Sequence, residues 1–271
     1  MSKPSDCTVW SADKLPSYRH PPVNEVVCGI RFQPFPDFTI PYIGLLWNRF
    51  REQYPRVQHA PPLAVGPDQI LVDTVTGVPL PRVWFMNQED NQLIQFQPDR
   101  IYFNWRQRQD VYPRYENVIR NFEEVLDTVQ TFLKESGFAE FSPVECELTY
   151  LNHIVRNPGV ETVNELQRVF RDFSWDKSPR FLPSPSSASW GMRFALPEKK
   201  GYLSASLKEG TLREGNVPLL VFNLTAKGIG RSMDRKGIRE WFDVAHTWIV
   251  CGFADLTTET IQTDVWERED A

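Results

Sequence analysis

The sequence is poor in the residues from which metal and redox sites are usually built. It has four cysteines, Cys7, Cys28, Cys146 and Cys251, and no two of them form a CxxC pair. It has four histidines and no closely spaced set of His, Cys and Asp ligands. We therefore expect no metal and no other cofactor. The cysteines within strand and helix patterns are expected to fill small spaces in the core.

Long apolar runs and an excess of positive charge are also missing. No run approaches the roughly 18 apolar residues that a membrane-spanning helix needs. The segment Met1–Asp6 is not followed by the apolar stretch of a secretory signal. The chain has 30 Lys and Arg against 35 Asp and Glu, a net charge of -5, whereas proteins that coat nucleic acid usually carry a basic excess. These absences predict a cytoplasmic protein and argue against a membrane or nucleic acid as its partner.

What the chain does have is a large supply of core residues. Its 271 residues are 41% hydrophobic and include 9 Trp, 18 Phe and 8 Tyr. Aromatic side chains bury large apolar areas, so a disordered chain is excluded. The length suits one large domain or two small ones.

Alternating and helical patterns predict the same series of elements twice. The first series is a strand at Asn24–Phe32, a helix at about Pro41–Tyr54, strands at Arg82–Asn87, Gln92–Gln97 and Arg100–Arg106, and a helix at Arg114–Ser136. The second is a strand at Pro143–Val155, a helix at Thr162–Phe173, strands at Ala188–Leu196, Gly201–Glu209 and Val217–Lys227, and a helix at Asp234–Phe253.

The two series align at nearly the same separation along the chain. Residues 26–32 (Val-x-Cys-x-Ile-x-Phe) match residues 144–150 (Val-x-Cys-x-Leu-x-Tyr), and Phe103-Asn104 matches Phe222-Asn223. Either an internal duplication or chance similarity between amphipathic elements explains this, and we favour duplication. The predicted fold class is α+β, with two similar β-α-β-β-β-α halves that form an extended antiparallel sheet with helices packed on one face. The predicted divisions are an irregular arm at 1–21, halves at 22–138 and 139–256, and a tail at 257–271.

The face of this sheet away from the helices is expected to be polar but little charged. Amides and phenols alternate there with apolar residues, which suits recognition by hydrogen bonds on a rigid platform. The alternatives are an ordinary solvated face or a buried amide network that joins the halves. The candidate binding residues are Gln95, Gln97, Tyr102, Asn104, Arg106, Asn152 and His153.

Four segments carry a resemblance to a known family. They are Pro21–Phe32, Leu93–Gln97 with Phe103–Arg106, Tyr112–Tyr115, and Cys146–Ile154. Together they resemble a sporadically distributed family of uncharacterised microbial proteins of about this length, from about residue 20 to Arg268. The resemblance implies no reaction. A patchy distribution is typical of accessory or defence systems.

Three functions remain open. The preferred hypothesis is a non-catalytic binding protein that presents the polar sheet face and the long loops at 55–81 and 174–187 to a protein or small-molecule partner. The first alternative is an enzyme with an acid–base site around Glu147 and His153, although six residues of strand separate them by about 20 Å. A weaker alternative is nucleotide or nucleic-acid binding through Arg100–Arg120. No catalytic residue is assigned, because no nucleophile motif is present. The glycine-rich run Gly228–Ser232 is interpreted as a tight turn rather than a phosphate site.

Overall fold

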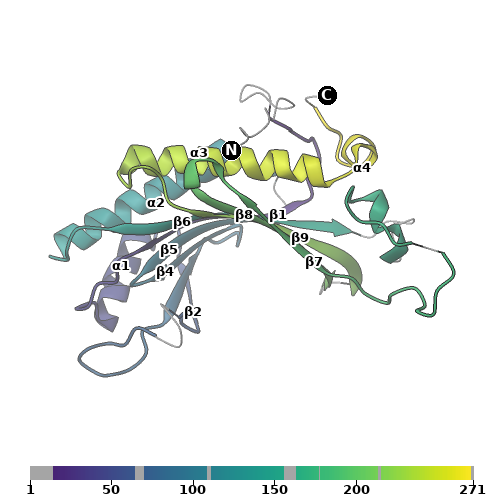
Figure 1. Ribbon diagram of the computed structural model, residues 1–271. Helices are drawn as coiled ribbons and strands as arrows, with labels where there is room; N and C mark the ends of the chain where they lie inside the picture. The colour runs from purple at the N-terminus through teal and green to yellow at the C-terminus, as the bar shows by residue number, and fades with distance from the viewer. Residues whose placement is uncertain are drawn as a thin grey trace. The chain divides into compact units, whose positions relative to one another are not determined.

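The computed structural model follows these patterns over most of the chain (Figure 1). It describes residues 15–64, 70–108, 111–155, 163–176, 178–212 and 215–269. Its strands are β1 (Val23–Phe32), β2 (Arg56–Ala60), β3 (Arg82–Met86), β4 (Gln92–Gln97), β5 (Arg100–Arg106), β6 (Pro143–Val155), β7 (Trp190–Ala195), β8 (Gly201–Leu212) and β9 (Val217–Gly228). Its helices are α1 (Ile40–Phe50), α2 (Tyr115–Glu135), α3 (Arg235–Leu256) and α4 (Glu259–Asp264), with short 3-10 helices η1 (Val163–Arg168) and η2 (Pro197–Lys199).

The strands form one antiparallel sheet in the order β2-β3-β4-β5-β1-β6-β9-β8-β7. The expected α+β class is thereby confirmed. The order β3-β4-β5-β1 in the first part of the chain matches the order β7-β8-β9-β6 in the second. A duplication requires this agreement, but the duplication itself stays a prediction.

Two elements differ from the sequence-based expectation. An additional strand, β2, lies at one edge of the sheet within the segment that was expected to be a loop. The helix expected at Thr162–Phe173 is only the 3-10 helix η1, and residues 156–162 lie outside the described part. Phe170 instead forms an isolated bridge with Thr257, and its ring centroid lies 5.0 Å from that of Phe222. Tertiary contacts therefore override the helical pattern here.

By its contacts the chain divides into two compact units. Unit 1 comprises Met1–Val23, Leu151–Ala226 and Asp243–Ala271, and unit 2 comprises Asn24–Tyr150 and Lys227–Phe242. Four elements, β1, β6, β9 and α3, have residues in both units. The units interleave along the sequence, whereas the predicted halves are contiguous.

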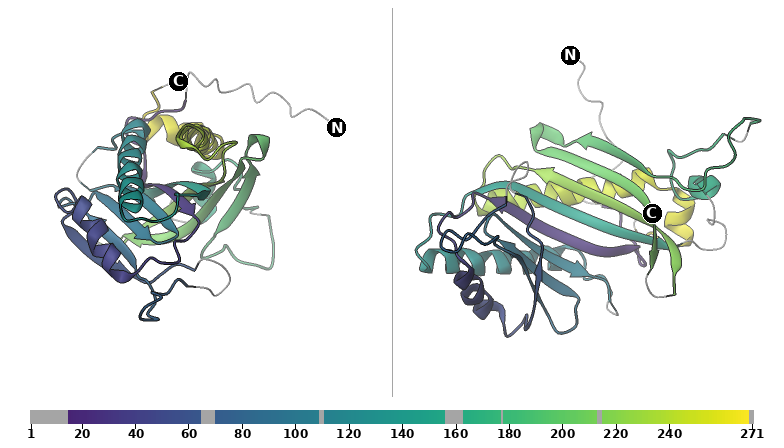
Figure 2. Two further views of the ribbon diagram at one scale, coloured as in Figure 1. Left: turned by 90° about the vertical axis from the view of Figure 1, so that its left-hand side faces the viewer. Right: turned by 90° about the horizontal axis from the view of Figure 1, so that it is seen from below.

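In unit 2, α1 and α2 cover the same face of the sheet (Figure 2). The ring centroid of Phe50 in α1 lies 6.1 Å from that of Phe85 in β3. Phe85 is paired with Ile94, and Ile94 with Phe103, so all three side chains lie on this face and are fully buried. The stripe of α2 is buried as its 3.6-residue spacing predicts. Its end is closed by Gly137, whose φ of 78° suits the left-handed position after a helix.

The start of α1 is capped by a residue that is distant in the sequence. Thr39 occupies the N-cap position of α1, but its side chain makes no capping hydrogen bond. Asp73, distant in sequence, accepts the Ile40 N–H at 2.8 Å and the N–H groups of Val75 and Thr76 at 2.9 and 3.0 Å. These hydrogen bonds lower the pKa of the Asp73 carboxyl. The bond from Ile40 has the largest effect, and those from Thr76 and Val75 add to it. The long-range carboxylate therefore replaces the local cap.

Unit 1 is built around an aromatic cluster. Phe222 of β9 lies between Phe170, Trp190 and Phe253, with ring centroids 5.0, 5.7 and 6.0 Å away. The C-terminal tail docks on its own chain, because Trp266 is buried with its ring 4.9 Å from that of Phe253. Among the described residues, none of the helices combines the length and hydropathy that crossing a bilayer requires.

Candidate functional site

The face of the unit 2 sheet opposite α1 and α2 carries several of the predicted binding residues. Gln95 is paired with Tyr102 across β4 and β5. Because side chains alternate along a strand, Asn104 and Arg106 point to the same side as Tyr102, away from the buried Phe103. We call this side the polar face of unit 2.

A chain of hydrogen bonds crosses the polar face over four strands. Arg82 of β3 donates to Gln95 of β4 at 3.3 Å, and Gln95 donates to Asn104 of β5 at 2.9 Å. Asn104 in turn donates to the Glu25 carboxylate of β1 at 2.7 Å. The Asn104 side chain is buried by these neighbours. An amide network is thus present, and it holds these side chains in one geometry.

Three arginines surround the turn between β3 and β4. Asp90, at φ 60°, accepts a hydrogen bond from Arg106 at 2.6 Å and from Arg108 at 2.7 Å, and Arg56 lies 3.7 Å away. Partial burial alone would raise the pKa of Asp90, but the Arg108 hydrogen bond and the three positive charges lower it. The Arg106 side chain is therefore half-buried and ion-paired with Asp90.

Two predicted binding residues serve the interior instead. Gln97 is fully buried, exchanges hydrogen bonds of 2.9 Å with the backbone of Leu63, and donates to Asp99. The chain after β2 therefore covers this end of the polar face. Asn152 of β6 is also buried and donates to the Phe222 carbonyl at 3.1 Å. Alternation alone does not reveal that a distant loop or strand covers a polar residue.

Glu147, the carboxylate of the enzyme hypothesis, has partners in unit 2. Lys227 Nζ lies 2.8 Å from its carboxylate, and the Tyr102 hydroxyl donates to it at 3.5 Å. Burial, and then the Glu147 charge, raise the pKa of Tyr102. The expected partner His153 belongs to unit 1, six residues further along β6. The acid–base site stays an untested alternative.

Burial favours the neutral form of two histidines. Burial lowers the pKa of His153 and lowers that of His246 to about 4, so both are neutral at pH 7. Within the described part of the chain, no group of three or more His, Cys, Asp and Glu side chains is arranged to hold a metal ion.

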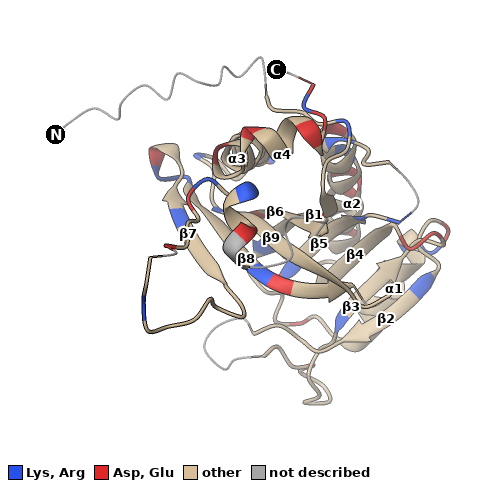
Figure 3. Cartoon of the chain, turned by 90° about the vertical axis from the view of Figure 1, so that its right-hand side faces the viewer, with Lys and Arg blue, Asp and Glu red and all other residues tan. Residues whose placement is uncertain are grey.

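The basic and aromatic segment Arg100–Arg120 is poorly arranged for stacking on bases. Arg100 is buried in an ion pair with Asp99 at 2.7 Å. The rings of Trp105 and Tyr115 are buried, so neither presents a face to a nucleobase. Basic and acidic residues are interspersed along the ribbon (Figure 3). Tyr112 is half-buried, with its hydroxyl 2.9 Å from that of Tyr150.

The glycine-rich run before α3 has the packing of a tight turn. A Cβ at Gly237 would lie 2.2 Å from the Ser232 carbonyl oxygen, and one at Gly230 would lie 2.8 Å from the same atom. Asp234 accepts the Gly237 N–H at 2.7 Å. A carboxylate already occupies the helix start, which disfavours a phosphate there.

Three donors lie at the rim of the amide network, and of their residues sequence reasoning named Arg106 but missed Arg82 and Trp84. The indole N–H of Trp84 and the Nε–H groups of Arg82 and Arg106 are buried without a hydrogen-bond partner among the described residues. All three side chains are half-buried at the polar face. Arg82 and Trp84 alternate with the apolar Val83 and Phe85, and this pattern could have placed both side chains on the polar face.

Comparison with known proteins adds little. No family model matches the chain, and no curated protein matches it in sequence. One solved structure, the crystal structure of DynU16 from the dynemicin biosynthetic locus, is 11% identical, with a TM-score of 0.23, over 86% of this chain and 98% of that one. A similarity this low supports neither a fold relationship nor a function.

Proposed function

We propose that the protein is a non-catalytic binding protein that presents the polar face of unit 2 to a protein or small-molecule partner. The hydrogen-bond chain from Arg82 through Gln95 and Asn104 to Glu25 supports this proposal. Affinity is higher when polar side chains are ordered before the ligand arrives, because binding then costs less side-chain entropy.

The unsatisfied groups specify the chemistry of the partner. Trp84 Nε1, Arg82 Nε and Arg106 Nε are all donors. A buried donor without an acceptor costs about 1–3 kcal/mol, which an acceptor on a ligand recovers. The exposed Arg56 and Arg108 add positive charge at one end of the face. We therefore infer a partner that presents hydrogen-bond acceptors, and carboxylates match the arginines best. Under the family resemblance, this binding would serve an accessory or defence system.

A panel of ligands tests the charge requirement. Succinate, glutarate and citrate are titrated calorimetrically into the full chain, with the diamine putrescine as the opposite-charge control. We expect at least one carboxylate to bind and putrescine not to bind. Absence of binding by every carboxylate contradicts the proposed chemistry.

A pair of variants then tests the location. Trp84→Phe keeps an aromatic ring but removes the indole donor together with part of the ring, so carboxylate binding should weaken by about 1 kcal/mol or more in a protein that still unfolds cooperatively. Arg120→Ala, on the exposed side of α2, is the matched control and should bind as the wild type does. Equal affinity of all three proteins would place the carboxylate site elsewhere.

A further inference from the structure

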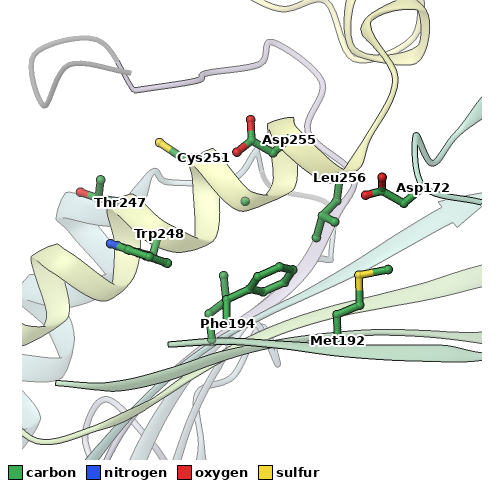
Figure 4. Close-up of a pocket in the computed structure, with 10 residues that line it drawn as sticks. Asp172, Met192, Phe194, Thr247, Trp248, Cys251, Asp255 and Leu256 are labelled. Carbon is green, nitrogen blue, oxygen red and sulfur yellow. The ribbon is translucent and has the colours of Figure 1, made fainter. Parts of the chain in front are cut away.

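Unit 1 contains an apolar groove that has no part in the proposed function. It lies between α3 and the strands β7 and β8 and has a volume of about 470 Å³ (Figure 4). Met192 and Phe194 project from β7 toward the helix, and Trp248 and Leu256 line the helical side. The groove volume lies within the range of roughly 300–1,000 Å³ typical of small-molecule sites.

The described residues only partly cover this part of the sheet. Phe170 packs against Trp190 at the start of β7, with ring centroids 5.5 Å apart. Further along β7, the Phe194 side chain is 38% exposed. α3 approaches β8 closely at Gly252, where a Cβ would lie 3.1 Å from Leu203 Cδ2. Apolar residues of β7 and β8 therefore face α3 across the groove, beside the exposed ring of Phe194.

One end of the groove is negatively charged. Asp172 and Asp255 lie at its rim near Leu256, while Thr247 and Trp248 lie at the other end. α3 ends at Leu256 without a basic residue in its last turn, so its carbonyl end adds partial negative charge. Among the described lining residues there is no Lys or Arg.

The position of Asp172 is fixed by its neighbours in the chain. The Arg171 N–H donates to the Leu256 carbonyl at 3.1 Å, and the Thr258 N–H donates to the Val169 carbonyl at 2.9 Å. The Arg171 side chain donates to the Thr257 carbonyl at 2.8 Å and lies 3.5 Å from Glu259. The adjacent cation is thus engaged with the end of the helix, and the backbone beside Asp172 is fixed while its exposed side chain lies at the rim.

We propose that this groove binds a small amphipathic amine, with its apolar body between α3 and β7 and its ammonium group at Asp172. From Thr247 to Asp255 the helix rises about 12 Å, which accommodates a linear apolar chain of moderate length. A neutral apolar compound gains nothing at the charged end, and an apolar acid is repelled there. The site is independent of the polar face of unit 2.

Matched ligands test the charge and the apolar body separately. Decylamine, decanol and decanoate, each below its aggregation concentration, are titrated calorimetrically into the full chain, with ethylamine as a short cation. We expect decylamine to bind at one site, decanol several-fold more weakly, and decanoate and ethylamine not measurably. Equal affinity for decylamine and decanoate would overturn the proposal.

Variants on the groove locate the site. Asp172→Asn should weaken decylamine binding by about threefold to tenfold and leave decanol unchanged. Phe194→Ala should weaken both ligands, because it removes the exposed apolar wall. Asp264→Asn, an exposed aspartate on α4, is the control and should bind as the wild type does. Melting temperatures confirm that each variant is folded. If Asp172→Asn and Phe194→Ala both retain wild-type affinity, the groove is not the amine site.

Discussion

Gly29 of β1 lies directly opposite Tyr102 of β5, and the tyrosine ring occupies the space where a Cβ would be. A Cβ at Gly29 would lie 2.0 Å from Tyr102 Cδ1 and 2.3 Å from Cε1. The ring is largely buried, and its hydroxyl reaches the Glu147 carboxylate. The glycine is therefore required by close approach of a side chain rather than by a turn.

Gly29→Ala is expected to destabilise the protein by about 1–3 kcal/mol, because the Tyr102 ring must leave its position and its contact with Glu147. Urea unfolding at pH 7 measures the effect. Gly44→Ala in α1 is the matched control, since no atom lies within 4 Å of the added Cβ. Alanine is the better helix former, so this variant should gain about 0.5–1 kcal/mol. Equal stability of the two variants would show that Tyr102 moves without cost.

Arg106→Ala is expected to lower the free energy of unfolding by about 1–2 kcal/mol, because it removes a charged hydrogen bond to Asp90 from a half-buried site. Arg120→Ala, on the exposed side of α2, should change it by less than about 0.5 kcal/mol. Chemical denaturation of both variants makes the comparison. An Arg106→Ala protein as stable as the wild type would mean that Arg108 and Arg56 alone hold Asp90.

Asp73 should make stability depend on pH in the acid range. Its folded pKa lies below the ordinary aspartate value, so its contribution is complete above about pH 5 and is lost as pH falls through the unfolded value of about 3.9 toward the lower folded one. Asp73→Asn should therefore be less stable than the wild type at pH 7, and the difference should shrink at pH 3. Melting temperatures at several pH values test this. The exposed Asp37→Asn is the control, and a difference independent of pH would exclude the carboxylate charge as its cause.

Much of the fold could be predicted because burial imposes a period on the sequence. β4, β5, β6 and β9 and the stripes of α2 and α3 lie close to the predicted positions, since each element buries one of its faces. Asn104 follows the buried Phe103 as Asn223 follows the buried Phe222, so each lies on the side away from its core phenylalanine. Agreement of this kind needs only alternation within a strand.

The remaining features depend on contacts between residues far apart in the chain. Alternation placed Gln97 on a polar face, but Leu63 covers that side chain. The position of Arg106 on a strand likewise did not indicate that it would form an ion pair with Asp90. The same holds for the cap of α1, which Asp73 supplies over 33 residues of sequence. By itself the sequence determined which residues are buried and in which elements. Only the tertiary structure decided which polar groups satisfy one another, because hydrogen bonds depend on ångström-scale distances that periodicity does not encode.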